Sequence, residues 1–261
     1  MTKSVTQPTA GTAVAPPART TVARVLTWES AWVVMGALGL PFVTALWVLI
    51  EFVSEGEVFA LWGPVAGLLG RYAFGYAIGH SLVGVMLPRY LLHGATRRSF
   101  LRQAPLVGTA LAAGGAVVVG AGWLVERAVF RLAGWPYALS TGADESFFGF
   151  LGQVAAGGLY TFMLQQPWTG VWRVVVVHWL VFTLWAALGA LLTAGFARGR
   201  LVGLGCVPVS LALLAVAEPG ISLPVPLPLP PPVVALVIGW LLAWAFVWVL
   251  VARAPLRVDP A

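Results

Sequence analysis

Long runs of apolar residues, separated by short polar or charged stretches, dominate this chain of 261 residues. A helix needs about 20 apolar residues to cross the hydrocarbon layer of a bilayer. Because a charged residue near the centre of such a helix is costly, charged residues mark the ends of candidate spans. Six runs meet this description: 30–50 (between Glu29 and Glu51), 58–88, 103–125, 174–197, 201–217 and 233–252. The pattern predicts an all-α fold, a polytopic transmembrane helical bundle of six spans.

A further uncharged run, 146–172, is less apolar because it contains Gln153, Gln165, Gln166 and Pro167. Cytoplasmic loops are enriched in Lys and Arg, so the basic residues can decide whether this run crosses the membrane. Six spans with a cytoplasmic N-terminus place eleven basic residues inside and three outside, whereas seven spans give eight and six. We therefore predict six spans, with both termini in the cytoplasm and an interfacial or re-entrant helix on the outer face at 147–164.

The domain organisation follows from these spans. Residues 28–253 form one membrane domain, preceded by a flexible cytoplasmic tail at 1–27 and followed by a cytoplasmic tail at 254–261. Hydrophobic residues make up 60% of the chain and charged residues 9%, which excludes a soluble domain of ordinary composition. The net charge of +6 is explained by the inner loops and indicates no nucleic-acid partner. We expect a multi-pass protein of the cell membrane.

The chemistry-bearing residues are sparse. The single cysteine, Cys206, excludes an internal disulfide and a cysteine-based metal cage. His80, His93 and His178 belong to no HExxH motif, and no paired carboxylates accompany them. His80 and His178 differ in predicted depth by roughly 12 Å, too much for two axial ligands of one haem iron, so we expect hydrogen-bonded histidines between helices. The sequence therefore predicts neither an enzyme nor a metal or other cofactor.

An energy source within the chain is also missing. All nine acidic residues lie at span ends, in loops or in tails, so no carboxylate near the bilayer midplane can support proton coupling. No Walker A motif for ATP binding occurs. A transporter built on this chain would need an outside driving force.

The second run contains the only charge within a predicted span, Arg71. Arg71 is either an interfacial anchor that snorkels to the outer surface or a polar residue at an outer gate. The same run has two GxxxG spacings, which allow helices to pack closely. The candidates for lining a translocation path are Arg71, Gly75, Gly79 and His80.

The inner loop after this run has the most distinctive pattern, GATRRSF at 94–100, with another arginine at position 102. A small residue, a threonine and an arginine pair precede an aromatic residue, which predicts a turn that leads into a short surface helix capped by Thr96. Basic inner loops are also ordinary topology determinants, and that interpretation stays open.

This segment resembles the cytoplasmic loop of ABC-2 type exporter permeases, in which a Gly-x-[ST]-[RK]-[RK]-x-[FL] pattern is frequent. The resemblance implies the permease subunit of an ATP-driven exporter that moves a hydrophobic or amphipathic substrate. It also implies a second permease subunit and a separate ATP-binding cassette subunit on which the loop docks. Membrane lipid is a further implied partner. The implied coupling residues are Gly94, Thr96, Arg97, Arg98, Phe100 and Arg102. The alternative is an integral membrane accessory or assembly protein that transports nothing.

Overall fold

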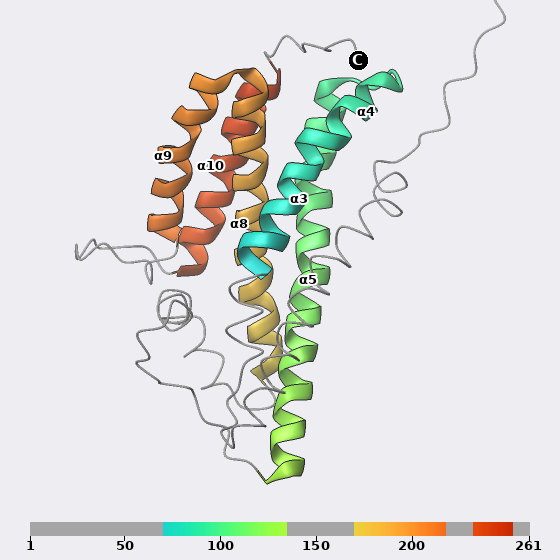
Figure 1. The fold of residues 1–261 in the computed structure, drawn as a ribbon, viewed down its shortest axis with the longest axis vertical. Helices are drawn as coiled ribbons and strands as arrows, with labels where there is room; N and C mark the ends of the chain where they lie inside the picture. Colours follow the sequence, from blue (N-terminus) through green and yellow to red (C-terminus); the bar gives the residue numbers. More distant parts are fainter. Residues whose placement is uncertain (1–69, 135–169, 218–231, 253–261) are drawn as a thin grey trace, which may run out of the picture.

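The computed structural model describes residues 70–134, 170–217 and 232–252 (Figure 1), and the regular structure in these ranges is entirely helical. The elements are η1 (Gly70–Gly75), α3 (Tyr76–His80), η2 (Ser81–Met86), α4 (Leu87–Leu92), α5 (Arg97–Ala133), α8 (Val171–Arg198), α9 (Arg200–Ala217) and α10 (Pro232–Ala252). Three helices are long and apolar enough to cross a membrane: Arg97–Ala133, Val171–Arg198 and Val234–Ala252. The predicted all-α class is confirmed for these ranges, and the three long apolar helices are consistent with the predicted membrane protein.

The predicted spans correspond to these helices in part. The runs 103–125, 174–197, 201–217 and 233–252 lie within α5, α8, α9 and α10, although α9 is shorter than the three spanning helices. The second half of the run 58–88 lies in η1, α3, η2 and α4. The first run, the tails 1–27 and 254–261, and nearly all of 146–172 lie outside the described residues. Six spans and the outer helix therefore stay predictions.

The helix that begins in the inner loop differs from the prediction. We expected a short surface helix followed by a separate third span, but one helix, α5, continues for 37 residues through Pro105. The reason is packing, because one face of α5 is buried along its length at nearly every fourth position. These buried positions include Phe100, Ala104, Gly108, Ala112, Ala116, Gly120 and Trp123. A continuous buried stripe stabilises the helix across the hydrogen bond that proline removes.

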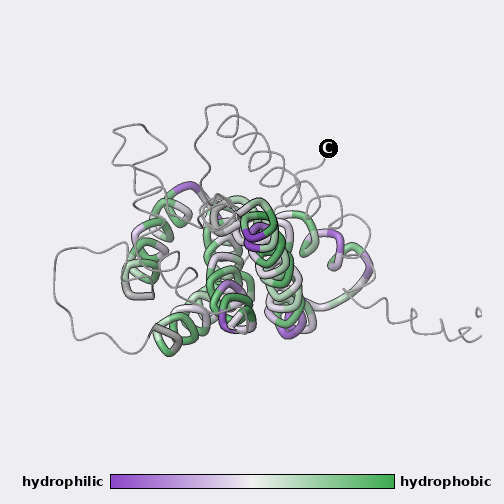
Figure 2. The backbone as a smooth tube through the Cα atoms, turned by 90° about the horizontal axis from the view of Figure 1, so that it is seen from below, coloured by the Kyte–Doolittle hydropathy of each residue, from purple (hydrophilic) through white to green (hydrophobic). Residues whose placement is uncertain are grey.

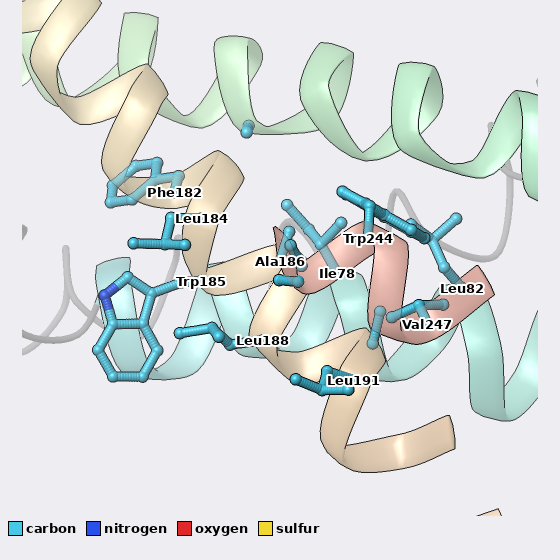
Figure 3. Packing of buried hydrophobic residues seen from close by; sticks show 14 of the residues in the cluster. Ile78, Leu82, Phe182, Leu184, Trp185, Ala186, Leu188, Leu191, Trp244 and Val247 are labelled. Carbon is cyan, nitrogen blue, oxygen red and sulfur yellow. The ribbon is translucent and has the colours of Figure 1, made fainter. Parts of the chain in front are cut away.

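The centre of the bundle is α8, which lies between the α9–α10 pair and the α3–α5 pair (Figure 1). Every residue from 181 to 191 is buried, so about three turns of α8 are covered on all sides. Figure 3 shows the packing around this segment, where Ile78 and Leu82 meet Trp244 and Val247 of α10 beside α8. Because α8 contacts each neighbouring helix, it fixes their relative positions.

Close contact between α3 and α8 depends on glycine. A Cβ atom added to Gly79 would overlap the backbone of Ala186 and Ala190, and one added to Gly189 would overlap the backbone of Tyr76. At Gly75, an added Cβ would lie 2.6 Å from the Trp185 Cβ. The close packing predicted from the Gly75–Gly79 spacing is confirmed.

The helices alternate in direction, and this gives the bundle two chemically different ends. Helix α8 begins beside the last part of α5, where Val171 and Val175 lie against Gly120, so the two helices are antiparallel (Figure 1). A six-span chain requires this arrangement, whereas a single crossing by 146–172 would make α5 and α8 parallel. One end, here called the basic end, carries Arg89, Arg97, Arg98, Arg102, Arg198 and Arg200. Seen along their axes in Figure 2, the helices are mostly white to green on the hydropathy scale, with a few purple segments.

Candidate functional site

The candidate site is the turn between α4 and α5 at the basic end. Two hydrogen bonds cap the C-terminus of α4, from the Gly94 N–H to the Leu91 carbonyl (3.0 Å) and from the Ala95 N–H to the Tyr90 carbonyl (3.3 Å). Gly94 has a φ of 77°, the left-handed conformation that glycine adopts most easily at a helix end. The Thr96 hydroxyl then accepts a hydrogen bond from the Ser99 N–H at 3.2 Å. The predicted N-cap at Thr96 is confirmed.

Side chains of α4 hold the first turn of α5 in place. The Tyr90 and Ser99 hydroxyl oxygens lie 3.1 Å apart, and the Gln103 amide donates to the Ser99 hydroxyl at 3.3 Å. The Tyr90 ring also contacts the ring of Phe100, with 5.7 Å between centroids. Phe100 is fully buried. It therefore belongs to the core of the α4–α5 turn and presents nothing to a partner.

The three arginines of this turn have different environments. Arg97 is half-buried, and its guanidinium donates to the carbonyl of Val251 at 3.4 Å. The last carbonyls of a helix have no partner within it, and the negative end of the helix dipole attracts cations, so Arg97 caps the end of α10. Arg98 and Arg102, one turn apart on α5, are both exposed. Of the predicted coupling residues, these two present charge outward.

The surroundings of Arg98 and Arg102 are strongly positive. Among the described residues the single acidic side chain is Glu126, which lies near the opposite end of α5. Arg198 and Arg200, on the α8–α9 turn at the basic end, are exposed as well. This end of the bundle can therefore bind carboxylates or phosphates through charge-assisted hydrogen bonds.

Sequence reasoning missed the role of Arg97 and the contributions of Tyr90 and Ser99. One signal was present in the chain, because Arg97 and Arg98 stand in the first turn of a helix, where the helix dipole disfavours positive charge. Arginines at that position need compensation from elsewhere. The identity of the compensating group, the end of α10, depends on a contact between residues 154 positions apart.

The path-lining candidates lie on a different part of the bundle. Gly75 and Gly79 pack against α8, and Arg71 lies in η1 with its side chain outside the described part of the chain. His80 is exposed, and its Nδ1 lies 3.1 Å from the Thr193 hydroxyl oxygen. Whether these residues border a path stays a prediction.

The histidines of both spans are hydrogen-bonded, but only His80 bonds to another helix as expected, because His178 bonds within α8. His178 is fully buried and its Nδ1 lies 2.8 Å from the carbonyl oxygen of Val174. His80 bonds to Thr193, fifteen residues after His178 on the same helix, which corresponds to roughly 22 Å along the axis. The two imidazoles therefore lie at different levels of the bundle.

Comparison of the chain with protein-family models, with curated proteins and with solved structures gives no match. The relation to ABC-2 type permeases consequently rests on the loop pattern and the order of the spans alone.

Proposed function

We propose that this chain is the permease subunit of an ATP-driven exporter of the ABC-2 type, located in the cell membrane and without catalytic activity of its own. The observation that carries the proposal is the exposed pair Arg98 and Arg102 at the beginning of α5, directly after the Thr96 cap at the basic end. In the proposal the basic end faces the cytoplasm, where positive charge is enriched. A soluble ATP-binding cassette subunit docks there, and a second permease subunit completes the path for a hydrophobic or amphipathic substrate.

The rigidity of the turn supports a coupling role. Thr96, Tyr90 and Ser99 hold the beginning of α5, and Arg97 connects it to the end of α10. A displacement of Arg98 or Arg102 would therefore move the beginning of α5 and, through Arg97, the end of α10. Such transmission is what a permease needs when its energy source is a separate subunit.

Purification from native membranes in mild detergent tests the proposal. We expect a subunit with a Walker A motif to be retained in stoichiometric amount and to hydrolyse ATP. Recovery of this chain alone or as a homo-oligomer, with no ATPase encoded beside it, would contradict the exporter and favour the accessory or assembly protein.

A further inference from the structure

The imidazole of His80 has a defined orientation on the surface of the bundle. The Thr193 hydroxyl donates its proton to the Gly189 carbonyl at 2.8 Å. Because that proton is engaged, the Thr193 oxygen can only accept from the His80 Nδ1, 3.1 Å away. The neutral ring therefore carries its proton on Nδ1, and Nε2 is an acceptor that faces away from Thr193.

With the arginines of the basic end at the membrane surface, as proposed above, this acceptor lies within the depth of the hydrocarbon layer. Thr193 precedes Arg198 by five residues and His80 precedes Arg89 by nine, which places the pair roughly 8 to 13 Å inside the basic end. His80 is nevertheless exposed. An acceptor in hydrocarbon without a donor costs free energy, so its position calls for a donor supplied from outside the described helices.

Contacts with its own segment of the chain also hold the imidazole in this orientation. Gly84, one turn after His80, is exposed, and a Cβ atom there would already lie 3.3 Å from the Thr193 methyl group and 3.5 Å from the His80 ring. On the other side, the Tyr76 ring stacks against the imidazole at 6.1 Å between centroids and 9° between planes. The π-helical segment Ser81–Met86 follows directly, and π-helical turns are frequent at functional sites.

We propose that the Nε2 of His80, oriented by the bond of Nδ1 to Thr193, binds the hydroxyl group of an amphipathic molecule whose chain lies in the bilayer. A neutral hydroxyl fits better than an ammonium group, because the single acidic residue among the described ones, Glu126, is near the opposite end of α5. A symmetric contact with a second copy would oppose two acceptor nitrogens, which cannot bond to each other. Only the idea that this amphipathic molecule is the transported substrate rests on the proposed function. The assignment of Nε2 as a hydrogen-bond acceptor does not depend on it.

Nitrogen NMR of the full chain, labelled with 15N-histidine, tests this site without an ATPase. In single-copy phosphatidylcholine nanodiscs the three histidines can be assigned with His93→Gln and His178→Gln. We expect the His80 Nε2 resonance to have the position of an unprotonated nitrogen and to move upfield when hexadecanol is added. Hexadecyl methyl ether, which has the same chain but no donor, should leave it unchanged. The Thr193→Val variant cannot accept from Nδ1, so the imidazole proton is free to move to Nε2. The change that hexadecanol causes in the Nε2 resonance should therefore be smaller in this variant.

Two further samples separate the sources of the hydroxyl group. A shift in phosphatidylglycerol nanodiscs without added alcohol would identify a resident lipid, and a shift with hexadecanol only would identify a free amphiphile. An equal shift with alcohol and ether, or no shift with any hydroxyl compound, would overturn the site. A shift that appears only in nanodiscs with two copies would also overturn it, in favour of a contact between subunits. None of these results depends on whether an ATPase binds the chain.

Discussion

At the scale of single residues, the contact between α3 and α8 depends on the missing side chain of Gly79. The atoms that an added Cβ would meet belong to the backbone of Ala186 and Ala190. Backbone atoms within a fully covered helix cannot turn aside as a flexible side chain does. The two helices would have to separate, and the packing around Ile78 would be lost with them.

Gly79→Ala should therefore lower the free energy of unfolding by about 1–3 kcal/mol, the range for overpacked cores. Gly114→Ala is the matched control, because Gly114 lies on the exposed face of α5 with open space around it. That change should stabilise the helix slightly, since alanine is favoured over glycine in helices by about 1 kcal/mol. Thermal unfolding followed by circular dichroism in detergent measures both. Equal stability of the two variants would contradict the close contact.

At the scale of elements, Arg97 connects the beginning of α5 with the end of α10 through the Val251 carbonyl. The last turn of a helix frays when its carbonyls lack partners. Val251 is buried, with 4% of its surface exposed. Loss of the Arg97 hydrogen bond should therefore open this turn before any other part of α10.

Arg97→Gln should increase the reactivity of a cysteine placed at Val251, in a Cys206→Ala background, toward a soluble thiol reagent. The expected increase is about fivefold or more, since the loss of a hydrogen bond of about 1 kcal/mol alone corresponds to about fivefold. Arg98→Gln removes the same charge one residue later from an exposed site and should leave the rate unchanged. If both variants react alike, Arg97 has no separate structural role.

Span positions could be predicted from the sequence because the energetic penalty for charge in hydrocarbon is large and local. The ends of α8 at Val171 and Arg198 differ from the predicted run, 174–197, by at most three residues. The continuity of α5 through Pro105 could not be predicted in this way, since it depends on partners of Phe100 and Ala104 in other helices. The burial of Phe100 follows from the same contacts.

At the scale of the whole molecule, charge asymmetry and helix direction agree. Arg98 and Arg198 lie at the same end of the bundle, although 99 residues separate them in the sequence. The chain between them runs along α5 and returns along α8. Sequence alone predicted that 103–125 and 174–197 run in opposite directions, and the structure confirms it. The ATP-binding subunit and the second permease subunit stay proposals, because the only pattern in the sequence that indicates them is the short loop 94–100.

Two cysteines introduced into the Cys206→Ala chain test the orientation in intact cells. His93 lies in the exposed turn at the basic end, and Ala133 is exposed at the other end of α5. If the basic end faces the cytoplasm, as proposed, a membrane-impermeant thiol reagent should label a cysteine at position 133 and spare one at position 93. Permeabilised cells, in which both should react, provide the control. Labelling at position 93 alone would place the basic end outside.

The central claim is that Arg98 and Arg102 dock a soluble ATPase at the basic end, and affinity measurements on two double variants test it most directly. Arg98→Gln with Arg102→Gln removes the exposed pair on α5, and Arg198→Gln with Arg200→Gln removes an equal charge on the α8–α9 turn at the same end. Charge-assisted hydrogen bonds contribute about 1.5–3 kcal/mol each, so the loss of two should weaken binding of the ATPase by at least about a hundredfold. The second should bind it within about threefold of the unmodified chain, as expected for a general change in charge. Equal losses in both variants, or none in the first, would contradict the account.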